Sequence, residues 1–423
     1  MSKTGLVWLF LYASGLAGAF IRGPIIGLAT YLFVFFTQES WARSLGQERW
    51  SFYAAVIAFI AMLVYKAQGK QKIRPRKPQF KWLILIVINM LIVSIFAVDP
   101  KSSHEAVMDF LKLMVLYYLI IESIDSRFHY KLIQWMMLWG NYLFGWLAYT
   151  EGKMVAGRLE NIGAPGIKNS NHLAGHMIMM IPFIGNLVLF GKWKEKILII
   201  LASPFILNAI MLCNSRGAFL GIILSGILYV VLTPNKMKPR IIFLALLGVS
   251  LIFLLANEQV INRFNTIQTY EEDASATNRL KSWAAALTLS GDYPFGAGGG
   301  GFTFLSPIYI PDIVGHHGDN NRSVHNTWLM MLTDWGIQGL LLLLIFYLST
   351  FWGILKTIKI AKKNGDIFYY FESLAILTGL IAGLLAATFG NRIYAETLYW
   401  FCALSNVLNN LYEQELKETK ASL

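Results

Sequence analysis

The sequence predicts an all-α polytopic membrane protein with about 12 transmembrane helices, and its composition, hydropathy and segment lengths all indicate this. Of its 423 residues, 56% are hydrophobic and only 14% are charged. A soluble globular chain carries about 25% charged residues, so this chain has too few charges to cover a surface that faces water. Its mean hydropathy is +0.52, and its apolar runs have lengths that suit a bilayer.

The predicted spans are apolar runs that approach the length of about 20 residues that a bilayer requires. Two short runs, 6–20 and 24–36, flank Arg22-Gly23-Pro24 and form either two spans or one broken hairpin. The first run lacks a small-x-small cleavage site, so it is interpreted as a membrane segment and not as a signal peptide. The remaining candidates are 51–65, 82–98, 106–121, 132–150, 173–190, 197–212, 218–232, 241–256, 327–355, 371–389 and 396–411.

The basic residues predict the orientation of these spans. Segment 66–81 is rich in Lys and Arg, and alternate loops further along also contain them, at 123–131, 192–196, 236–240 and 356–363. Basic loops collect in the cytoplasm, which explains the net charge of +12 without nucleic-acid binding. The same rule places the long segment 257–324 outside, in the periplasm if the membrane is a bacterial inner membrane.

Three regions follow from this orientation. Residues 1–256 are transmembrane helices with short loops, 257–324 form a partly helical periplasmic loop with part of the active site, and 325–423 are C-terminal helices and a cytoplasmic tail. A loop of this size rarely builds its own large core, so we expect it to pack onto the membrane bundle. Cys213 and Cys402 stand alone in apolar runs and predict neither a disulfide nor a zinc site.

Arg216 lies where one predicted span ends outside the membrane and the next begins. Ser215 is expected to cap the new helix, which leaves Arg216 in the first turn with its charge opposed to the helix dipole. A bound anion would offset this, because an arginine fork and the N–H groups of a helix start together form a phosphate cradle. The alternative is an interfacial arginine that reaches lipid headgroups.

Arg279 lies in the outer loop, in a segment that predicts an amphipathic helix. Ser275 or Thr277 is expected to cap this helix, which runs to about Ser290. Its apolar side chains share one face, so the helix lies either on the membrane or on the bundle. Arg279 then either binds a ligand or belongs to a solvated face.

Histidines gather in segment 312–328. His325 is expected to open the helix of the span 327–355, and helical spacing predicts that it shares a face with Gly336. The positive end of the helix dipole disfavours a charged imidazole, and a neutral ring suits a general base; the alternative is an interfacial histidine that only forms hydrogen bonds. His316 and His317 are adjacent and lack metal-ligand spacing, so no metal site is predicted.

Four other segments carry polar or unusual residues. The glycine-rich segment 293–302 allows close approach of a ligand or a helix, or is a flexible loop, and it lacks the Gly-Lys-Ser/Thr of a nucleotide-binding loop. Asp99 and Glu105 either hold a divalent cation or belong to a turn and a helix start. Segment 163–172 can line an entrance, and Arg392 stands near the last outer loop.

Taken in order, four motifs resemble the O-antigen ligase superfamily. They are Ser-Arg-Gly at 215–217, Asn-Arg-x-x-x-Trp at 278–283, Pro-Phe-Gly-x-Gly at 294–298 and His-Asn-x-x-Leu at 325–329. The superfamily also includes O-antigen polymerases and some protein O-oligosaccharyltransferases. The resemblance covers residues 173–347, less than half of the chain.

The resemblance implies a glycosyltransferase that works without metal or cofactor. It implies transfer of a glycan from undecaprenyl pyrophosphate to a sugar hydroxyl of lipid A–core, with inversion, at the periplasmic face of the inner membrane. Carried over to this chain, Arg216 and Arg279 bind the pyrophosphate, and His325 is the general base. Further candidates for substrate binding are Tyr309, His316, His317 and Arg392.

Alternatives stay open within and outside this class. An O-antigen polymerase would use a lipid-linked glycan as both donor and acceptor, and a protein O-oligosaccharyltransferase would use a protein acceptor; the shared motifs do not separate them. A lipid or solute transporter would show repeat symmetry and polar groups near the midplane. The polar residues here gather at the outer face instead, which favours an enzyme.

Overall fold

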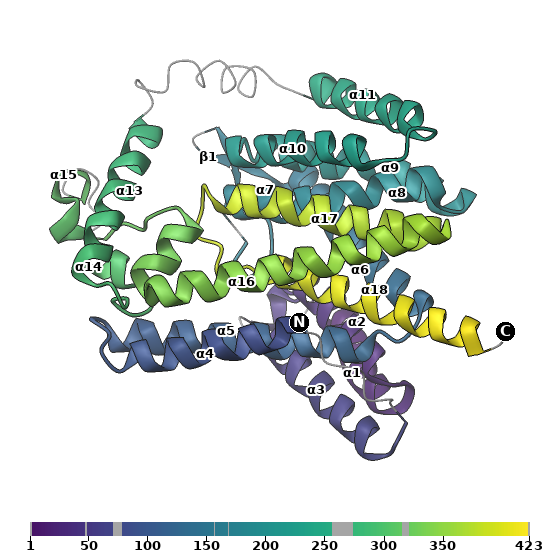
Figure 1. The fold of residues 1–423 in the computed structure, drawn as a ribbon, viewed down its shortest axis with the longest axis horizontal. Coiled ribbons are helices and arrows are strands. Elements are labelled where there is room, and N and C mark those ends of the chain that lie inside the picture. The colour runs from purple at the N-terminus through teal and green to yellow at the C-terminus, as the bar shows by residue number, and fades with distance from the viewer. Residues whose placement is uncertain are drawn as a thin grey trace.

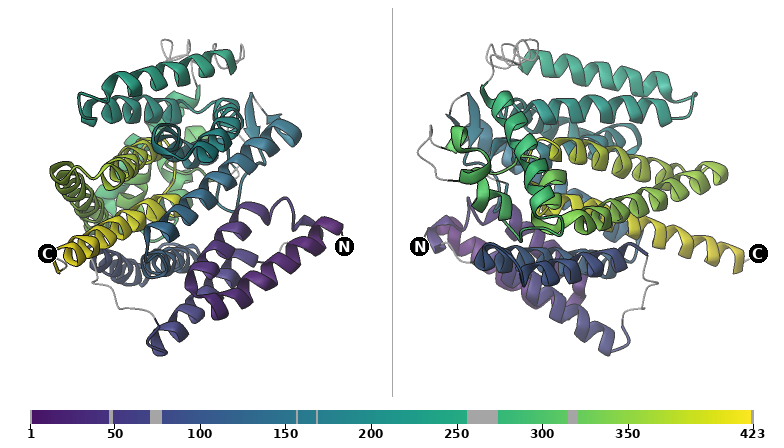
Figure 2. Two further views of the ribbon diagram at one scale, coloured as in Figure 1. Left: turned by 90° about the vertical axis from the view of Figure 1, so that its right-hand side faces the viewer. Right: turned by 60° about the vertical axis from the view of Figure 1, so that its left-hand side comes forward.

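The computed structural model describes residues 2–46, 49–70, 78–155, 157–167, 169–255, 274–314 and 321–421. They form a helical bundle with one short hairpin, β1 (Lys153–Val155) and β2 (Arg158–Glu160) (Figure 1). The further views show most helices lying side by side along a common direction (Figure 2). The predicted all-α class is therefore confirmed.

The chain is a multi-pass membrane protein by the length and composition of its helices. Among the described residues, six helical segments are long and apolar enough to cross a membrane: Lys3–Arg22, Trp50–Ala67, Ser170–Phe190, Trp193–Leu212, Thr327–Asn364 and Ile367–Ala387. Shorter apolar helices lie at Pro24–Thr37, Gln79–Ser94 and Arg216–Leu232. The expected total of about 12 spans stays a prediction.

The two N-terminal runs form a helical hairpin. Helix α1 (Lys3–Arg22) ends at Gly23, whose φ of +112° suits glycine, and α2 (Pro24–Thr37) begins at the next residue. The indole nitrogen of Trp8 donates to the Thr37 hydroxyl at 2.7 Å, so the far ends of the two helices lie together. An antiparallel pair fits both alternatives for this region, two spans or one broken hairpin, so the number of spans here stays a prediction.

The next helices are α3 (Trp50–Ala67), α4 (Pro78–Ser94), α5 (Pro100–Ser123) and α6 (Arg127–Glu151), with a single 3-10 turn at Arg43–Leu45 before α3. Asp99 caps α5, because its carboxylate accepts the backbone N–H groups of Lys101 at 3.2 Å and Ser102 at 3.3 Å. This arrangement favours the helix-start interpretation of Asp99 over the cation site.

After the β1–β2 hairpin the chain forms α7 (Ser170–Met177), the 3-10 turn η2 (Ile178–Met180), α8 (Ile181–Phe190), α9 (Trp193–Leu212), α10 (Arg216–Leu232) and α11 (Lys238–Leu255). The described part of the long loop contains α13 (Ala274–Asp292), α14 (Gly301–Tyr309) and α15 (Pro311–Val314), and these gather at one end of the bundle (Figure 1). The chain then completes the bundle with α16 (Thr327–Asn364), α17 (Ile367–Ala387) and α18 (Glu396–Ala421).

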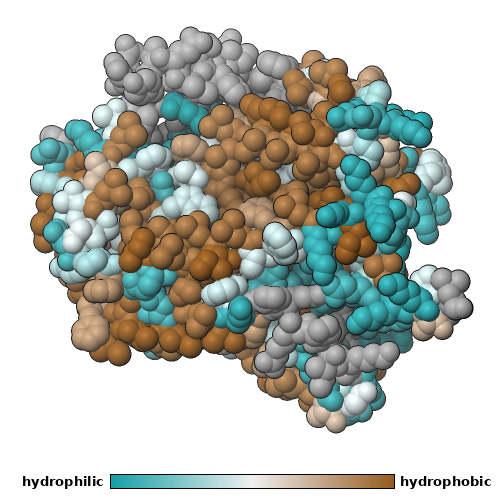
Figure 3. Space-filling view, viewed as in Figure 1, coloured by the Kyte–Doolittle hydropathy of each residue, from teal (hydrophilic) through white to brown (hydrophobic). Residues whose placement is uncertain are grey.

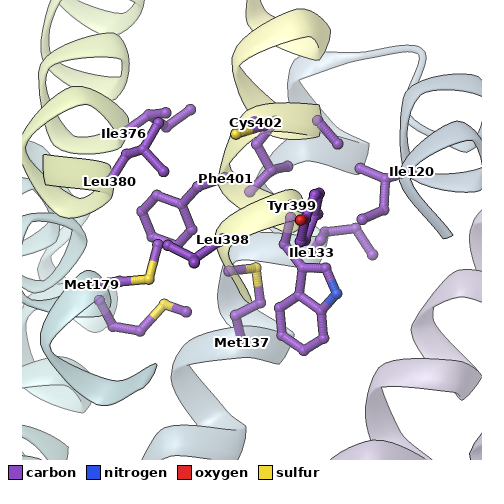
Figure 4. Packing of buried hydrophobic residues seen from close by; sticks show 14 of the residues in the cluster. Ile120, Ile133, Met137, Met179, Ile376, Leu380, Leu398, Tyr399, Phe401 and Cys402 are labelled. Atoms are coloured by element: carbon purple, nitrogen blue, oxygen red, sulfur yellow. The ribbon is translucent and has the colours of Figure 1, made fainter. Parts of the chain in front are cut away.

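Helices α17 and α18 form the centre of the bundle. Phe401 and Leu398 of α18 pack beside Met179 and against Leu380 of α17 (Figure 4). Small residues bring the backbones close, as is usual between membrane helices. A Cβ added to Gly379 would lie 2.5 Å from the carbonyl oxygen of Met179. The outer helices instead expose their apolar side chains.

These exposed side chains cover the middle of the molecule. Figure 3 shows hydrophobic residues across the central area, with hydrophilic residues gathered on the right, where α16 and α18 end. Leu254 of α11 is 80% exposed and Trp352 of α16 is 77% exposed. A surface of this kind suits contact with lipid.

Helix α16 bends at Gly336, whose φ is +74° and ψ is 176°, and the glycine-rich segment packs into the bend. The N–H of Gly298 donates to the carbonyl of Asp334 at 2.9 Å. The Asp334 carboxylate accepts the N–H groups of Gly300 at 3.0 Å and Phe302 at 3.3 Å, at the start of α14. The glycines therefore serve close approach to a neighbouring helix, one of the three uses predicted for them.

The described part of segment 257–324 packs onto the bundle through this bend and through α13, which contacts α16. A small apolar cluster joins its helices: Ala285, Ala286, Leu289, Ala297, Phe302, Leu305, Ile310, Ile313 and Val324. This cluster holds the segment that leads into α16 in place beside α13.

Candidate functional site

The short connection 388–395, between α17 and α18, contacts each of the segments that carry the predicted residues Arg216, Arg279 and His325. The ring of Phe389 packs against α10, because a Cβ added to Gly217 would lie 3.0 Å from its Cδ2 atom. The same ring lies beside Trp283 of α13, with 6.2 Å between ring centroids. Gly217 follows Arg216, and Trp283 is one helical turn after Arg279. Phe389 therefore links the two helices that carry the predicted arginines.

The start of α16 joins the same connection. The Thr327 hydroxyl donates to the carbonyl of Gly390 at 2.7 Å and accepts the backbone N–H of Arg392 at 2.8 Å. Thr327 is buried and lies two residues after His325. Arg216, Arg279 and His325, which are far apart in the sequence, thus come from three elements that meet at residues 388–395.

His325 lies outside α16, and its predicted sharing of a helical face with Gly336 is wrong. The helix begins at Thr327, because the Asn326 side chain caps it by accepting the N–H groups of Trp328 at 3.0 Å and Leu329 at 3.1 Å. His325 precedes this cap with a φ of +52°. Residues other than glycine rarely adopt this backbone conformation. It costs on the order of 1–3 kcal/mol, and such residues are concentrated at functional sites.

The His325 ring stays neutral at neutral pH, as predicted, although the causes differ from the predicted helix dipole. His325 is partly exposed to solvent, but its desolvation by the surrounding protein is the largest effect on its pKa. Electrostatic interactions with Arg279, His172 and Arg322 follow, in that order. Together they lower the pKa of His325 to about 4. The charge effect also indicates that Arg279 and Arg322 lie near this ring.

Arg216 is the first residue of α10, as predicted. Ser215 occupies the cap position, but its side chain makes no capping hydrogen bond, so the predicted serine cap is wrong. Asn214, just before it, has a φ of +49°. This left-handed residue turns the chain from α9 into α10, so the turn is made by the backbone and does not need the serine hydroxyl.

Arg279 is half-buried on α13, and the predicted helix is confirmed. The predicted cap is wrong, because α13 already includes Ala274, so that Ser275 and Thr277 lie inside the helix. The arginine is therefore held on a regular helix, in the turn before the Trp283 ring that contacts Phe389.

Arg392 is buried deeply, with 1% of its surface exposed. Among the described residues, none hydrogen-bonds to any of its three guanidinium nitrogens. The guanidinium lies against α7, where a Cβ added to Gly175 would collide with its Nη1 atom. Burial lowers the pKa of Arg392 to about 10, and its charge acts on His172 and His176 of α7.

Tyr309 is tied to α13 and not to this connection. The Tyr309 hydroxyl donates to Asp292 at 2.6 Å, which joins α14 to α13 and raises the pKa of Tyr309 to about 12. A role of Tyr309 in substrate binding stays a prediction. His316 and His317 lie outside the described residues.

Two residues near His325, His172 and Arg322, were not among the predicted site residues. His172, at the start of α7, belongs to the segment predicted to line an entrance, and Arg322 belongs to the polar run before His325. The backbone N–H of Arg322 donates to the Ser306 hydroxyl at 2.7 Å, which fixes this run against α14. Arg322 was recognisable as a neighbour of the motif, whereas the approach of α7 has no local signal.

The arrangement therefore brings together arginines and a neutral imidazole at one end of the bundle. Within the described ranges, no group of three or more His, Cys, Asp or Glu residues could hold a metal ion. Guanidinium groups bind phosphates, and a neutral imidazole can accept a proton.

Comparison with known proteins agrees with the motif order. Residues 198–344 match a family model described as O-antigen ligase. The matched segment contains Arg216, Arg279 and His325. No curated protein matches the chain.

Proposed function

Through residues 198–344 the chain belongs to the O-antigen ligase superfamily, and we propose that it is an O-antigen ligase. In this proposal it transfers a glycan from undecaprenyl pyrophosphate to a sugar hydroxyl of lipid A–core. The reaction takes place at the periplasmic face of a bacterial inner membrane. The observation that supports the proposal is that the segments carrying Arg216, Arg279 and His325 all contact residues 388–395, through Gly217, Trp283 and Thr327.

The two arginines are assigned to the donor pyrophosphate. Guanidinium groups form paired hydrogen bonds with phosphate oxygens, and these strengthen as negative charge develops on the leaving group. Arg216 is held at a helix start, where the helix dipole also favours an anion. Arg279 lies close enough to His325 for its charge to act on the ring, so the donor would bind beside the base.

His325 is assigned as the general base. Its neutral ring accepts the proton of the acceptor hydroxyl while the hydroxyl oxygen attacks the anomeric carbon. The bond between that carbon and the pyrophosphate oxygen breaks, and its electron pair leaves with undecaprenyl pyrophosphate. Attack from the side opposite to the leaving group inverts the anomeric centre. The imidazolium then returns its proton to solvent.

Arg392 is assigned to the same donor site as an inner cation. A buried guanidinium without a hydrogen-bond partner is costly, and a phosphate oxygen would offset that cost. Its backbone is tied to Thr327, two residues after His325, which supports a place beside the reacting groups. Tyr309, His316 and His317 stay predicted contributors to substrate binding.

The acceptor distinguishes this proposal from its relatives. We suggest reconstituting the full chain in vesicles with purified undecaprenyl-pyrophosphate glycan and offering lipid A–core, a second lipid-linked glycan or a protein acceptor separately. A ligase forms glycosylated lipid A–core. Growth of the lipid-linked glycan alone would assign a polymerase, and glycosylated protein would assign a protein O-oligosaccharyltransferase. Transfer to none of the three, with the donor merely moved across the bilayer, would indicate a transporter.

A further inference from the structure

A cavity with apolar walls and a few charged and polar groups lies at the end of the bundle opposite to His325. It has a volume of about 480 Å³ and opens between the start of α6, the end of α8 and the start of α17. Helix α17 runs from this cavity at Ile367 to Ala387, just before the connection at the candidate site. The length of a membrane helix therefore separates the cavity from the proposed glycosyl transfer.

The rim of the cavity is cationic and its walls are aromatic. Arg127 and Lys131 come from the first turns of α6. The rings that line the cavity are Phe128, Phe190, Phe368 and Phe371. Phe190 and Phe371 lie 4.4 Å apart between ring centroids, and Phe128 is 73% exposed. An aromatic side chain this exposed at the bundle surface suits contact with lipid chains.

The two cations are not equivalent. Arg127 pairs with two carboxylates, Glu415 through its Nε at 2.8 Å and Asp366 through its Nη2 at 3.2 Å. Lys131 is half-buried and forms no ion pair with the described residues; its Nζ lies 5.8 Å from the centroid of the Phe368 ring. Lys131 is therefore the cation available to a ligand, with Arg127 beside it.

The polar groups inside the cavity are the Glu372 carboxylate and the Asn186 side-chain amide. Glu372 is 6% exposed, and its carboxylate accepts the Tyr130 hydroxyl at 3.0 Å and the Gln134 amide at 2.8 Å. Asn186 also lines the cavity, and its side-chain amide donates a hydrogen bond to the Glu372 carboxylate at 3.3 Å. A carboxylate can accept about four hydrogen bonds, so Glu372 can receive a ligand hydroxyl as well.

We propose that this cavity binds a phospholipid with an anionic, hydroxylated headgroup, such as phosphatidylglycerol. The lipid phosphate contacts Lys131 beside Arg127, the headgroup hydroxyls donate to Glu372, and the acyl chains lie along Phe128 and Phe190. Basic pockets between membrane helices bind anionic headgroups in this way. The choline headgroup of phosphatidylcholine has no hydroxyl to donate to Glu372, and the positive charge of Lys131 would repel its quaternary ammonium group.

The test uses the purified full chain in detergent, titrated with phosphatidylglycerol or phosphatidylcholine and followed by native mass spectrometry. We expect preferential binding of phosphatidylglycerol, weakened about tenfold in Lys131→Gln, which loses a hydrogen bond to a charged group. Lys359→Gln is the matched control, because Lys359 is exposed on α16 and does not line the cavity. Glu372→Gln should reduce the preference for phosphatidylglycerol over phosphatidic acid, which lacks the glycerol hydroxyls.

Two results would overturn the proposal. One is equal binding of phosphatidylglycerol by the wild type and Lys131→Gln. The other is complete competition by soluble glycerol phosphate at the lipid's own concentration, which would assign a soluble phosphate site instead. The readout is binding, so it does not depend on glycosyl transfer.

Discussion

At the scale of single residues, the backbone of His325 is the strongest sign of function. A histidine with a φ of +52° is held in a conformation that the chain would avoid in a free loop. Two anchors directly after His325 hold this segment in place: the Asn326 cap and the contact of Thr327 with Gly390. These contacts therefore fix the strained His325 relative to the connection 388–395, which also contacts α10 and α13.

The low pKa of His325 predicts an unusual pH profile. A base with a pKa of about 4 loses activity only when the pH falls through that value and the ring becomes protonated. Removing the positive charge in Arg279→Gln should move this acidic limb to higher pH, because one of the forces that lower the pKa is gone. The pH dependence of kcat/KM for the donor between pH 4 and 8 reports the base of the free enzyme and tests this prediction. An acidic limb near pH 6.5 in the wild type, unmoved by the substitution, would contradict it.

The position of Arg392 predicts the effect of a single methyl group. Gly175→Ala should displace the guanidinium without removing its charge, and should raise the KM for the donor about tenfold if one charged hydrogen bond is lost. Gly185→Ala is the matched control, because nothing lies within 4 Å of an added Cβ there. Equal KM values for both variants, with Gly175→Ala still folded, would remove Arg392 from the donor site.

Sequence motifs predicted the residues of the site better than their local structure. Arg216, Arg279 and His325 were found from the order of four short motifs, but the caps assigned to Ser215, Ser275 and Thr277 were wrong. Cap rules act on one or two residues, and tertiary contacts such as the packing of Phe389 on Gly217 can outweigh them. The approach of His172 depends on how α7 packs, which no spacing in the sequence encodes.

At the scale of helices, apolar runs located the helices but not their ends. Helix α16 was predicted over 327–355 and continues to Asn364, where Gly365 ends it with a φ of +70°. Helix α18 similarly runs to Ala421 although its apolar run ends at residue 411. Hydropathy records where a segment faces lipid, whereas helix ends depend on caps and glycines, so charged turns can extend a helix beyond the membrane.

The bend of α16 predicts a structural role for the glycine-rich segment. Gly296 has a φ of +100°, and a Cβ there would lie 2.6 Å from the carbonyl of Asp334. Gly296→Ala should therefore lower the free energy of unfolding by about 1–3 kcal/mol. Gly291→Ala is the control, since its added Cβ would meet open space. The measurement is thermal unfolding in detergent, and equal stability of the two variants would contradict the packing described for this bend.

At the scale of the whole molecule, charge separates the two ends of the bundle. The end with the loops predicted to be cytoplasmic carries Arg127 and Lys131 at a cavity, and the other end carries the arginines and His325 of the candidate site. Composition alone predicted the membrane class, because 14% charged residues cannot cover a water-facing surface. The convergence on residues 388–395 could not be predicted, since it depends on the packing of α7, α10, α13 and α16 around α17.

The most direct test of the central claim is the release of undecaprenyl pyrophosphate by the reconstituted chain during transfer to lipid A–core. We predict one undecaprenyl pyrophosphate released for each glycan transferred. Release and transfer should fall together by at least about a hundredfold in Arg216→Gln, Arg279→Gln and His325→Asn, the last chosen because asparagine tolerates a positive φ. His104→Asn, at an exposed position on α5, should keep the wild-type rate. Wild-type release and transfer in His325→Asn would contradict the account.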